Sequence, residues 1–153
     1  MNSLELKVPP PFVALAIALL TWGTSTVSQA IDVPFAWRLG VALLLVIVGQ
    51  SISISAMVAF RHAKTTMNPI KASAASSLVS SAVYRFTRNP MYLGLLLTLS
   101  AWAVFLSNPV ALLFVPLFVL YMNRYQIGPE ERVLSSLFGA EYAAYKKKVR
   151  RWL

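Results

Sequence analysis

Long uncharged runs dominate the chain and alternate with short polar segments. Three runs contain no charged residue: 8–31, 39–60 and 89–123. A membrane-spanning helix needs roughly 20 apolar residues to cross about 30 Å of hydrocarbon, so the first two runs each accommodate one helix. The third run would form a helix of about 52 Å, which is too long for one crossing, and Ser107-Asn108-Pro109 divides it. The pattern therefore predicts an all-α integral membrane protein with about four transmembrane helices.

We place the predicted elements from these runs in a single membrane domain, 1–153. The expected spans are approximately 12–28, 36–60, 91–106 and 109–125, with a cytoplasmic loop at 61–90 and C-terminal interfacial helices at 129–150. Composition agrees with this class, since only 12% of the residues are charged, against about 25% in soluble domains. Three prolines, 9–11, precede the first apolar run. The start therefore differs from a cleaved signal peptide, and we expect the first span to stay as an anchor.

The distribution of basic residues predicts the orientation of the chain. Five Lys and Arg residues lie in Arg61–Arg88 and seven from Arg124 onward, whereas the 29–37 connection has none. By the positive-inside rule, both termini and the Arg61–Arg88 segment lie in the cytoplasm, as expected of an inner-membrane protein. The net charge of +9 then indicates attraction to anionic lipid head groups, and we expect no nucleic-acid partner.

Two polar segments outside the spans have helical patterns. Lys71–Ala82, built from Ala, Ser, Leu and Val, predicts a short helix on the membrane face. In the tail, one apolar and aromatic stripe with three- and four-residue spacing predicts an interfacial helix; it comprises Leu134, Phe138, Tyr142, Tyr145 and Val149. Gly139 is expected to end a first helix there and allow a second to begin.

Chemistry-bearing residues gather in two clusters, 84–92 and 124–132. In the first cluster the polar residues precede Pro90. A helix normally ends before a proline, so we expect this segment to connect one helix to the next. An antiparallel hairpin with an outer turn brings its two inner ends together, which predicts two facing sets of side chains. These sets are Arg88, Asn89 and Tyr92 on one side and Arg124, Glu130 and Glu131 on the other. We expect no metal site, because the chain has no cysteine and only one histidine, His62.

The motifs in the second half resemble those of one enzyme group. They are Tyr84-Arg85, Thr87-Arg88-Asn89-Pro90-Met91-Tyr92-Leu93-Gly94, Pro129-Glu130-Glu131, and Phe138-Gly139-Ala140-Glu141-Tyr142 with Tyr145 and Val149. In order and spacing this half of the chain is similar to the isoprenylcysteine carboxyl methyltransferase and phospholipid methyltransferase group. The resemblance implies an integral-membrane enzyme that uses S-adenosylmethionine and methylates a lipophilic, membrane-associated acceptor. No Gly-x-Gly-x-x-Gly motif occurs among the six glycines, so a Rossmann-type cofactor site is not expected.

The resemblance also implies roles for individual residues. The expected cofactor-binding residues are Tyr84, Arg88, Asn89, Tyr92, Glu130 and Glu131. Arg124 lies where a substrate-orienting arginine is expected, and Glu130 or Glu131 would be the base for an amine acceptor, with Arg124 and Glu131 as the catalytic pair. Eukaryotic carboxyl methyltransferases of this group tend to have His where this chain has Asn89. An amide does not titrate near neutrality, so the acceptor stays open between carboxylate, amine and thiol.

Two other function classes remain open from the sequence. One is a nicotinamide-dependent membrane enzyme of the sterol reductase type, which resembles the same C-terminal half. The other is a non-enzymatic small membrane protein, such as a transporter subunit or an assembly factor. The spans carry no ionisable residue at mid-membrane, which disfavours ion-coupled transport.

Overall fold

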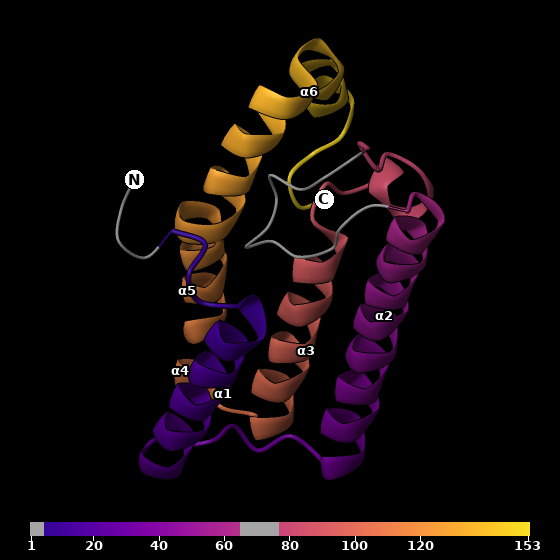
Figure 1. Ribbon diagram of the computed structural model, residues 1–153. Coiled ribbons are helices and arrows are strands. Elements are labelled where there is room, and N and C mark those ends of the chain that lie inside the picture. Colours follow the sequence, from indigo (N-terminus) through magenta and orange to yellow (C-terminus); the bar gives the residue numbers. More distant parts are fainter. Residues whose placement is uncertain (1–4, 65–76) are drawn as a thin grey trace.

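The computed structural model describes residues 5–64 and 77–153, and within them it is helical without a β-strand. The elements are α1 (Pro10–Val27), α2 (Phe35–His62), the 3₁₀-helix η2 (Ala82–Arg85), α3 (Pro90–Leu106), α4 (Pro109–Leu112), α5 (Phe114–Tyr121), the π-helical turn η3 (Met122–Ile127) and α6 (Gly128–Lys148). The long helices run side by side, and the last part of α6 and the C-terminus lie at the end opposite the α1–α2 connection (Figure 1).

Helix length and composition identify an integral membrane protein. Within the described residues, three helical stretches are long and apolar enough to cross a membrane: Pro10–Val27, Phe35–His62 and Pro109–Lys148. Helix α3 is apolar but has 17 residues. Large apolar side chains on α1 and α2 face outward, among them Phe12, Leu19 and Ile47. Such extensive exposed apolar surface is expected where the surroundings are lipid.

Small residues bring α2 and α3 into close contact. A Cβ atom added at Gly94 would lie 2.6 Å from the carbonyl oxygen of Gly49 and would also clash with the side chain of Ser53. The Gln50 side chain donates a hydrogen bond to Thr98 Oγ1 at 3.1 Å in the same interface. In lipid, burial of apolar surface contributes little free energy to helix association. Helices associate there through close packing of small residues and through hydrogen bonds between polar side chains, as they do here.

The core beside this interface joins α1, α3, α5 and η3. Its fully buried side chains include Phe118, Met122 and Ile127, which pack with Ile17 and Leu99. Trp102 adds a direct connection, since its indole N–H donates to the Ala18 carbonyl oxygen at 3.1 Å. The first helix is therefore fixed against the second half of the chain.

Two prolines shape the helix that follows α3. Pro116 has no N–H for the carbonyl of Leu112, and its ring crowds that turn, so the helix breaks at Leu113 between α4 and α5. Pro129 likewise cannot donate to the Tyr125 carbonyl, and the N–H of Leu6 donates to that oxygen instead at 3.0 Å. The predicted 109–125 span is thus an interrupted helix that ends in a π-helical turn.

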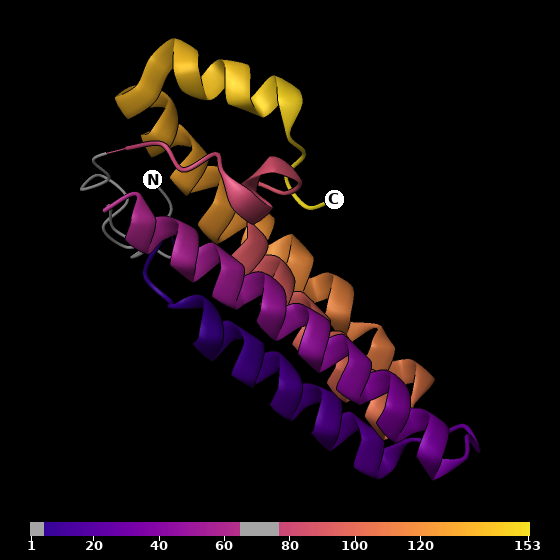
Figure 2. The same ribbon diagram turned by 90° about the vertical axis from the view of Figure 1, so that its right-hand side faces the viewer.

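Helix α6 changes direction at Gly139. This residue has φ 47° and ψ −117°, a conformation that glycine adopts without a Cβ penalty, and the predicted break there is confirmed. The second half of α6 turns across the end of the helices (Figure 2). Its aromatic stripe forms a core of its own, in which Tyr142, Tyr145 and Val149 are buried.

The short helix predicted for Lys71–Ala82 falls mainly outside the described residues, which resume at Ser77. The part from Ser77 to Ser81 is not helical, so the prediction is wrong there. A 3₁₀-helix begins only at Ala82, whose φ of 52° lies in the left-handed region. A turn of this kind explains why a composition that favours a helix does not produce one over Ser77–Ser81.

Replacing Gly94 with alanine tests the α2–α3 contact. We expect Gly94→Ala to reduce the free energy of unfolding in detergent by about 1–3 kcal/mol, because the added methyl group meets backbone that cannot move alone. Gly40→Ala is the matched control, since a Cβ at Gly40 meets nothing within 4 Å. Equal unfolding midpoints for the two variants would contradict this packing.

Candidate functional site

Residues 84–90 connect η2 to α3, and we call this segment the joint. The last residues of the chain hold it in place. Thr87 forms an isolated parallel bridge with Arg150, and the Arg88 N–H donates to the Arg150 carbonyl oxygen at 3.0 Å. The Tyr145 hydroxyl donates to the carbonyl oxygen of Tyr84 at 2.7 Å. The segment after α6 therefore lies along the joint, although Thr87 and Arg150 are 63 residues apart in the sequence.

Glu131, in the first turn of α6, is bound by two arginines from different segments. Its Oε1 lies 2.7 Å from Arg88 Nη2, and its Oε2 lies 2.6 Å from Arg151 Nη2. The Arg88 and Glu131 side chains are only 11% and 15% exposed. Burial acts to raise the pKa of Glu131, but the hydrogen bonds and charges of Arg151 and Arg88 outweigh it and hold the pKa below its ordinary value. Glu131 is a fixed anion.

Arg88 also closes the end of α6. Its Nη1 donates to the carbonyl oxygens of Lys146 and Val149, at 3.2 and 2.7 Å. The last carbonyls of a helix lack intrahelical donors, and a guanidinium placed there satisfies them. Arg88 Nε, in contrast, is buried without a hydrogen-bond partner. One arginine therefore joins the start and the end of α6 and keeps a free donor.

Glu130, the neighbouring acid, has different surroundings. The Tyr92 hydroxyl and the Gln126 side-chain amide, the latter at 3.2 Å, both donate to its Oε1. No described residue donates to its Oε2. Burial raises the pKa of Glu130 from 4.5 to about 7, although the two hydrogen bonds act in the opposite direction. Two adjacent carboxyls thus titrate far apart, and only Glu130 exchanges a proton near neutrality.

The C-terminal segment completes the arrangement. The Asn89 amide donates to the Arg151 carbonyl oxygen at 2.8 Å. Asn123, in the π-helical turn, accepts from the Trp152 indole at 3.1 Å and from Arg151 Nη1 at 3.4 Å. Trp152 also packs against the core that contains Met122. We call this set the polar cluster: Arg88, Asn89, Tyr92, Asn123, Gln126, Glu130, Glu131 and Arg151.

Most of the predicted site residues lie together in this cluster. Arg88, Asn89, Tyr92, Glu130 and Glu131 are members, as the hairpin geometry led us to expect. Tyr84 is buried beside them and packs edge-on against Phe60, with ring centroids 5.5 Å apart. Arg124 is exposed, its Cζ lies 6.0 Å from the ring centroid of Tyr125, and its side chain forms no ion pair with an acid of the cluster.

Sequence reasoning missed three members of the cluster. Arg151 belongs to the basic tail, whose charge predicts attraction to anionic head groups, yet its side chain binds Glu131. Asn123 and Gln126 lie on either side of Arg124, and no motif marks them. Their spacing gives a partial signal, because Gln126 precedes Glu130 by one helical turn and can contact it. No local pattern identifies Arg151, whose position depends on the turn after Lys148.

Comparison with known proteins shows which family contains this chain. The profile of a family described as phospholipid methyltransferase matches residues 37–141. The chain belongs to this family. The matched region includes the joint, the π-helical turn and the first turn of α6, and therefore every predicted site residue. Arg151 lies beyond it.

Individual relatives agree with the family assignment. Protein-S-isoprenylcysteine O-methyltransferase of Saccharomyces cerevisiae is 36% identical over 69% of this chain and 44% of its own length. Protein-S-isoprenylcysteine O-methyltransferase A of Arabidopsis thaliana is 30% identical over 74% of this chain and 57% of its own length. An uncharacterised protein of Haemophilus influenzae is 56% identical over its full length, which covers 41% of this chain. The chain spans about half the length of the named methyltransferases. No solved structure matches.

The raised pKa of Glu130 predicts a specific pH dependence of the free energy of unfolding. The folded-state pKa of Glu130 is about 7 and its ordinary value is 4.5, so its contribution is complete below pH 4.5 and is lost as the pH rises through 7. One pKa unit corresponds to about 1.4 kcal/mol, which makes the loss on the order of 3 kcal/mol. Unfolding midpoints in detergent from pH 4.5 to 8 should fall accordingly, and Glu130→Gln should flatten this slope. Asp32→Asn, at an exposed carboxyl far from the cluster, should retain it; equal slopes in wild type and Glu130→Gln would contradict the assignment.

Proposed function

We propose that this chain is an S-adenosylmethionine-dependent methyltransferase that acts on a lipophilic or membrane-associated acceptor. The observation that carries the proposal is the polar cluster itself: two partly buried acids with opposite pKa shifts meet Tyr92 and Arg88 at the end of an apolar helix. These residues lie within the part of the chain that matches a methyltransferase family. The related isoprenylcysteine methyltransferases support the reaction class.

The proposal includes a topology. We assign four spans, with α3 crossing as a short helix alongside α1, α2 and the α4–η3 stretch, in one membrane domain. Local thinning or tilt accommodates a helix of this length at modest cost. The basic residues of 61–88 and of the tail support a cytoplasmic polar cluster and cytoplasmic termini, since the opposite connections carry no Lys or Arg and Arg38, in the first turn of α2, is the one basic residue near them. The acceptor would then enter from the bilayer and the cofactor from the cytoplasm.

The chemistry of the polar cluster fits the proposed cofactor. Two polar atoms of the cluster remain for a ligand: the buried Arg88 Nε has no hydrogen-bond partner, and the partly buried Glu130 Oε2 accepts from no described residue. A guanidinium binds a carboxylate, and an anionic carboxyl beside an aromatic ring attracts a cationic centre. The residues that would hold the cofactor are Tyr84, Arg88, Asn89, Tyr92, Glu130 and Glu131. When bound, it supplies a methyl group activated on a sulfonium.

The residues of the chain have separable roles in this proposal. Tyr92 and Gln126 fix the orientation of Glu130. The Arg88–Glu131–Arg151 network fixes α6 and the C-terminal segment against the joint, which shields the site from water. Alignment of the reacting groups and exclusion of water are the main demands of such a transfer.

The two acids differ in their suitability as a base. A neutral amine acceptor requires a proton acceptor with a pKa near the working pH, and the pKa of Glu130 meets this condition. Glu131, whose two oxygens are both paired, is better suited to position Arg88. A carboxylate acceptor needs no base, and exposed Arg124 could orient it from outside the polar cluster.

Calorimetric titration of the detergent-solubilised full chain with S-adenosylhomocysteine tests the proposal. We expect the wild type to bind and both Tyr92→Phe and Glu130→Gln to bind at least about tenfold more weakly, since hydrogen bonds to charged groups contribute about 1.5–3 kcal/mol. Asp32→Asn is the control and should bind like the wild type. Absence of wild-type binding, or unchanged affinity in both variants, would sink the proposal. Titration with NADPH in the same buffer tests the nicotinamide alternative, for which binding should be absent.

A further inference from the structure

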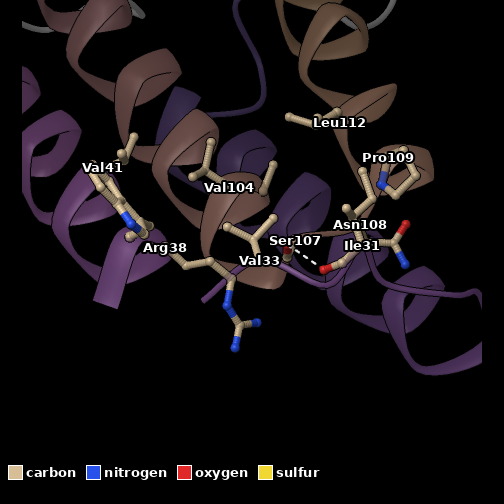
Figure 3. Close-up of a pocket in the computed structure, with 11 residues that line it drawn as sticks. Ile31, Val33, Arg38, Val41, Val104, Ser107, Asn108, Pro109 and Leu112 are labelled. Carbon is tan, nitrogen blue, oxygen red and sulfur yellow. Dashed lines mark hydrogen bonds between the residues drawn. The ribbon is translucent and has the colours of Figure 1, made fainter. Parts of the chain in front are cut away.

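A second candidate site lies at the opposite end of α3 from the polar cluster. A cavity of about 220 Å³ opens between the α1–α2 connection and helices α2, α3 and α4. It is lined by Ile31, Val33, Arg38, Val104, Ser107 and Leu112, among others (Figure 3). Tyr92 and Ser107 are 15 residues apart on one helix, which corresponds to roughly 22 Å. The cavity is therefore separate from the proposed methyl-transfer site.

The interior of this cavity is apolar. Val33, Val104 and Leu112 come from three different elements and converge on it (Figure 3). Its volume is below the roughly 300–1,000 Å³ typical of pockets for drug-sized ligands. An apolar space of this size suits the end of a hydrocarbon chain better than a complete polar ligand.

Arg38 supplies a cation at the rim of the cavity. Its Nη1 donates to the Phe105 carbonyl oxygen at 3.3 Å, while its Nε is buried without a hydrogen-bond partner. Asp32, the nearby acid in the sequence, forms no ion pair with it. A buried donor without a partner is costly, more so when it is charged. Among the described residues no acid pairs with this guanidinium, and an anionic group at the rim would neutralise its charge.

The sequence makes this cation unusual for its end of the molecule. Arg38 is the only basic residue in 8–60, and the turn at 107–109 has none. Trp37, also part of the cavity lining, is 71% exposed, and exposed tryptophans are enriched where hydrocarbon meets head groups. A guanidinium beside such a tryptophan matches the phosphate of a lipid in both charge and geometry.

We propose that this cavity and Arg38 form a binding site for an anionic phospholipid. The phosphate lies against the Arg38 guanidinium, and the end of one acyl chain fills the space bounded by Val33, Val104 and Leu112. The lipid then joins the α1–α2 connection to the α3–α4 turn. This site is independent of the proposed methyl transfer and does not require it.

Native mass spectrometry of the full chain in detergent tests the lipid site. The protein is incubated with phosphatidylglycerol or phosphatidylcholine, and the retained lipid is counted. We expect retention of phosphatidylglycerol only. Soluble glycerol phosphate at the same concentration should not displace it, because it lacks the acyl chain. Equal retention of both lipids, or displacement by glycerol phosphate, would overturn the proposal.

Three variants separate the charge from the cavity. Arg38→Gln should reduce retention about tenfold or more, since a charged hydrogen bond is lost. Val104→Phe fills the cavity, leaves Arg38 in place, and should reduce retention as well, which an arginine acting only as an interfacial anchor does not predict. Arg61→Gln, at an exposed arginine on the other end of α2, is the matched control and should retain the lipid. Wild-type retention by Val104→Phe would contradict the site.

Discussion

The arrangement of the functional end depends on one partly buried carboxylate, that of Glu131. Arg88 reaches it from the joint before α3, and Arg151 reaches it from the C-terminal segment. Leaving a buried charge without its partner costs several kcal/mol, so these three parts of the chain are obliged to stay together. The same Arg88 satisfies the last carbonyls of α6. Through this single anion, the start of α6, its end and the start of α3 form one unit.

Backbone irregularities make that unit possible. Pro129 leaves the Tyr125 carbonyl without a helical donor, and the π-helical turn before it places Asn123 and Gln126 toward the polar cluster. Single π-helical turns are frequent at functional sites. Gly139 then turns α6 back, so that Tyr145 contacts the joint and the chain ends beside it. The same folding partly buries Glu130, and its raised pKa is a consequence of the geometry that fixes Glu131.

Hydrophobic runs and residue spacing predict much of this structure. The apolar runs identify the helices, and Gly139 and the stripe from Leu134 to Val149 indicate the turn in α6, because both signals are local. Topology alone brings Arg88 and Tyr92 to Glu130 and Glu131. Local signals fail for Arg151, which looks like any residue of a basic run, and for Ser77–Ser81, where tertiary structure overrides helical composition. Arg124 is exposed, because one helical position decides whether a side chain faces the cluster or the outside, and a π-helical turn shifts that position. Its proposed role stays a prediction.

Transfer of a labelled methyl group to lipid tests the central claim most directly. The chain in detergent would be incubated with methyl-labelled S-adenosylmethionine and a total lipid extract, and the products would be analysed by mass spectrometry. The account predicts labelled lipid from the wild type and from Arg150→Gln, whose side chain is exposed, and at least about tenfold less from Arg151→Gln, which leaves Glu131 with one arginine. No label above a membrane background, or equal labelling by the two arginine variants, would contradict it.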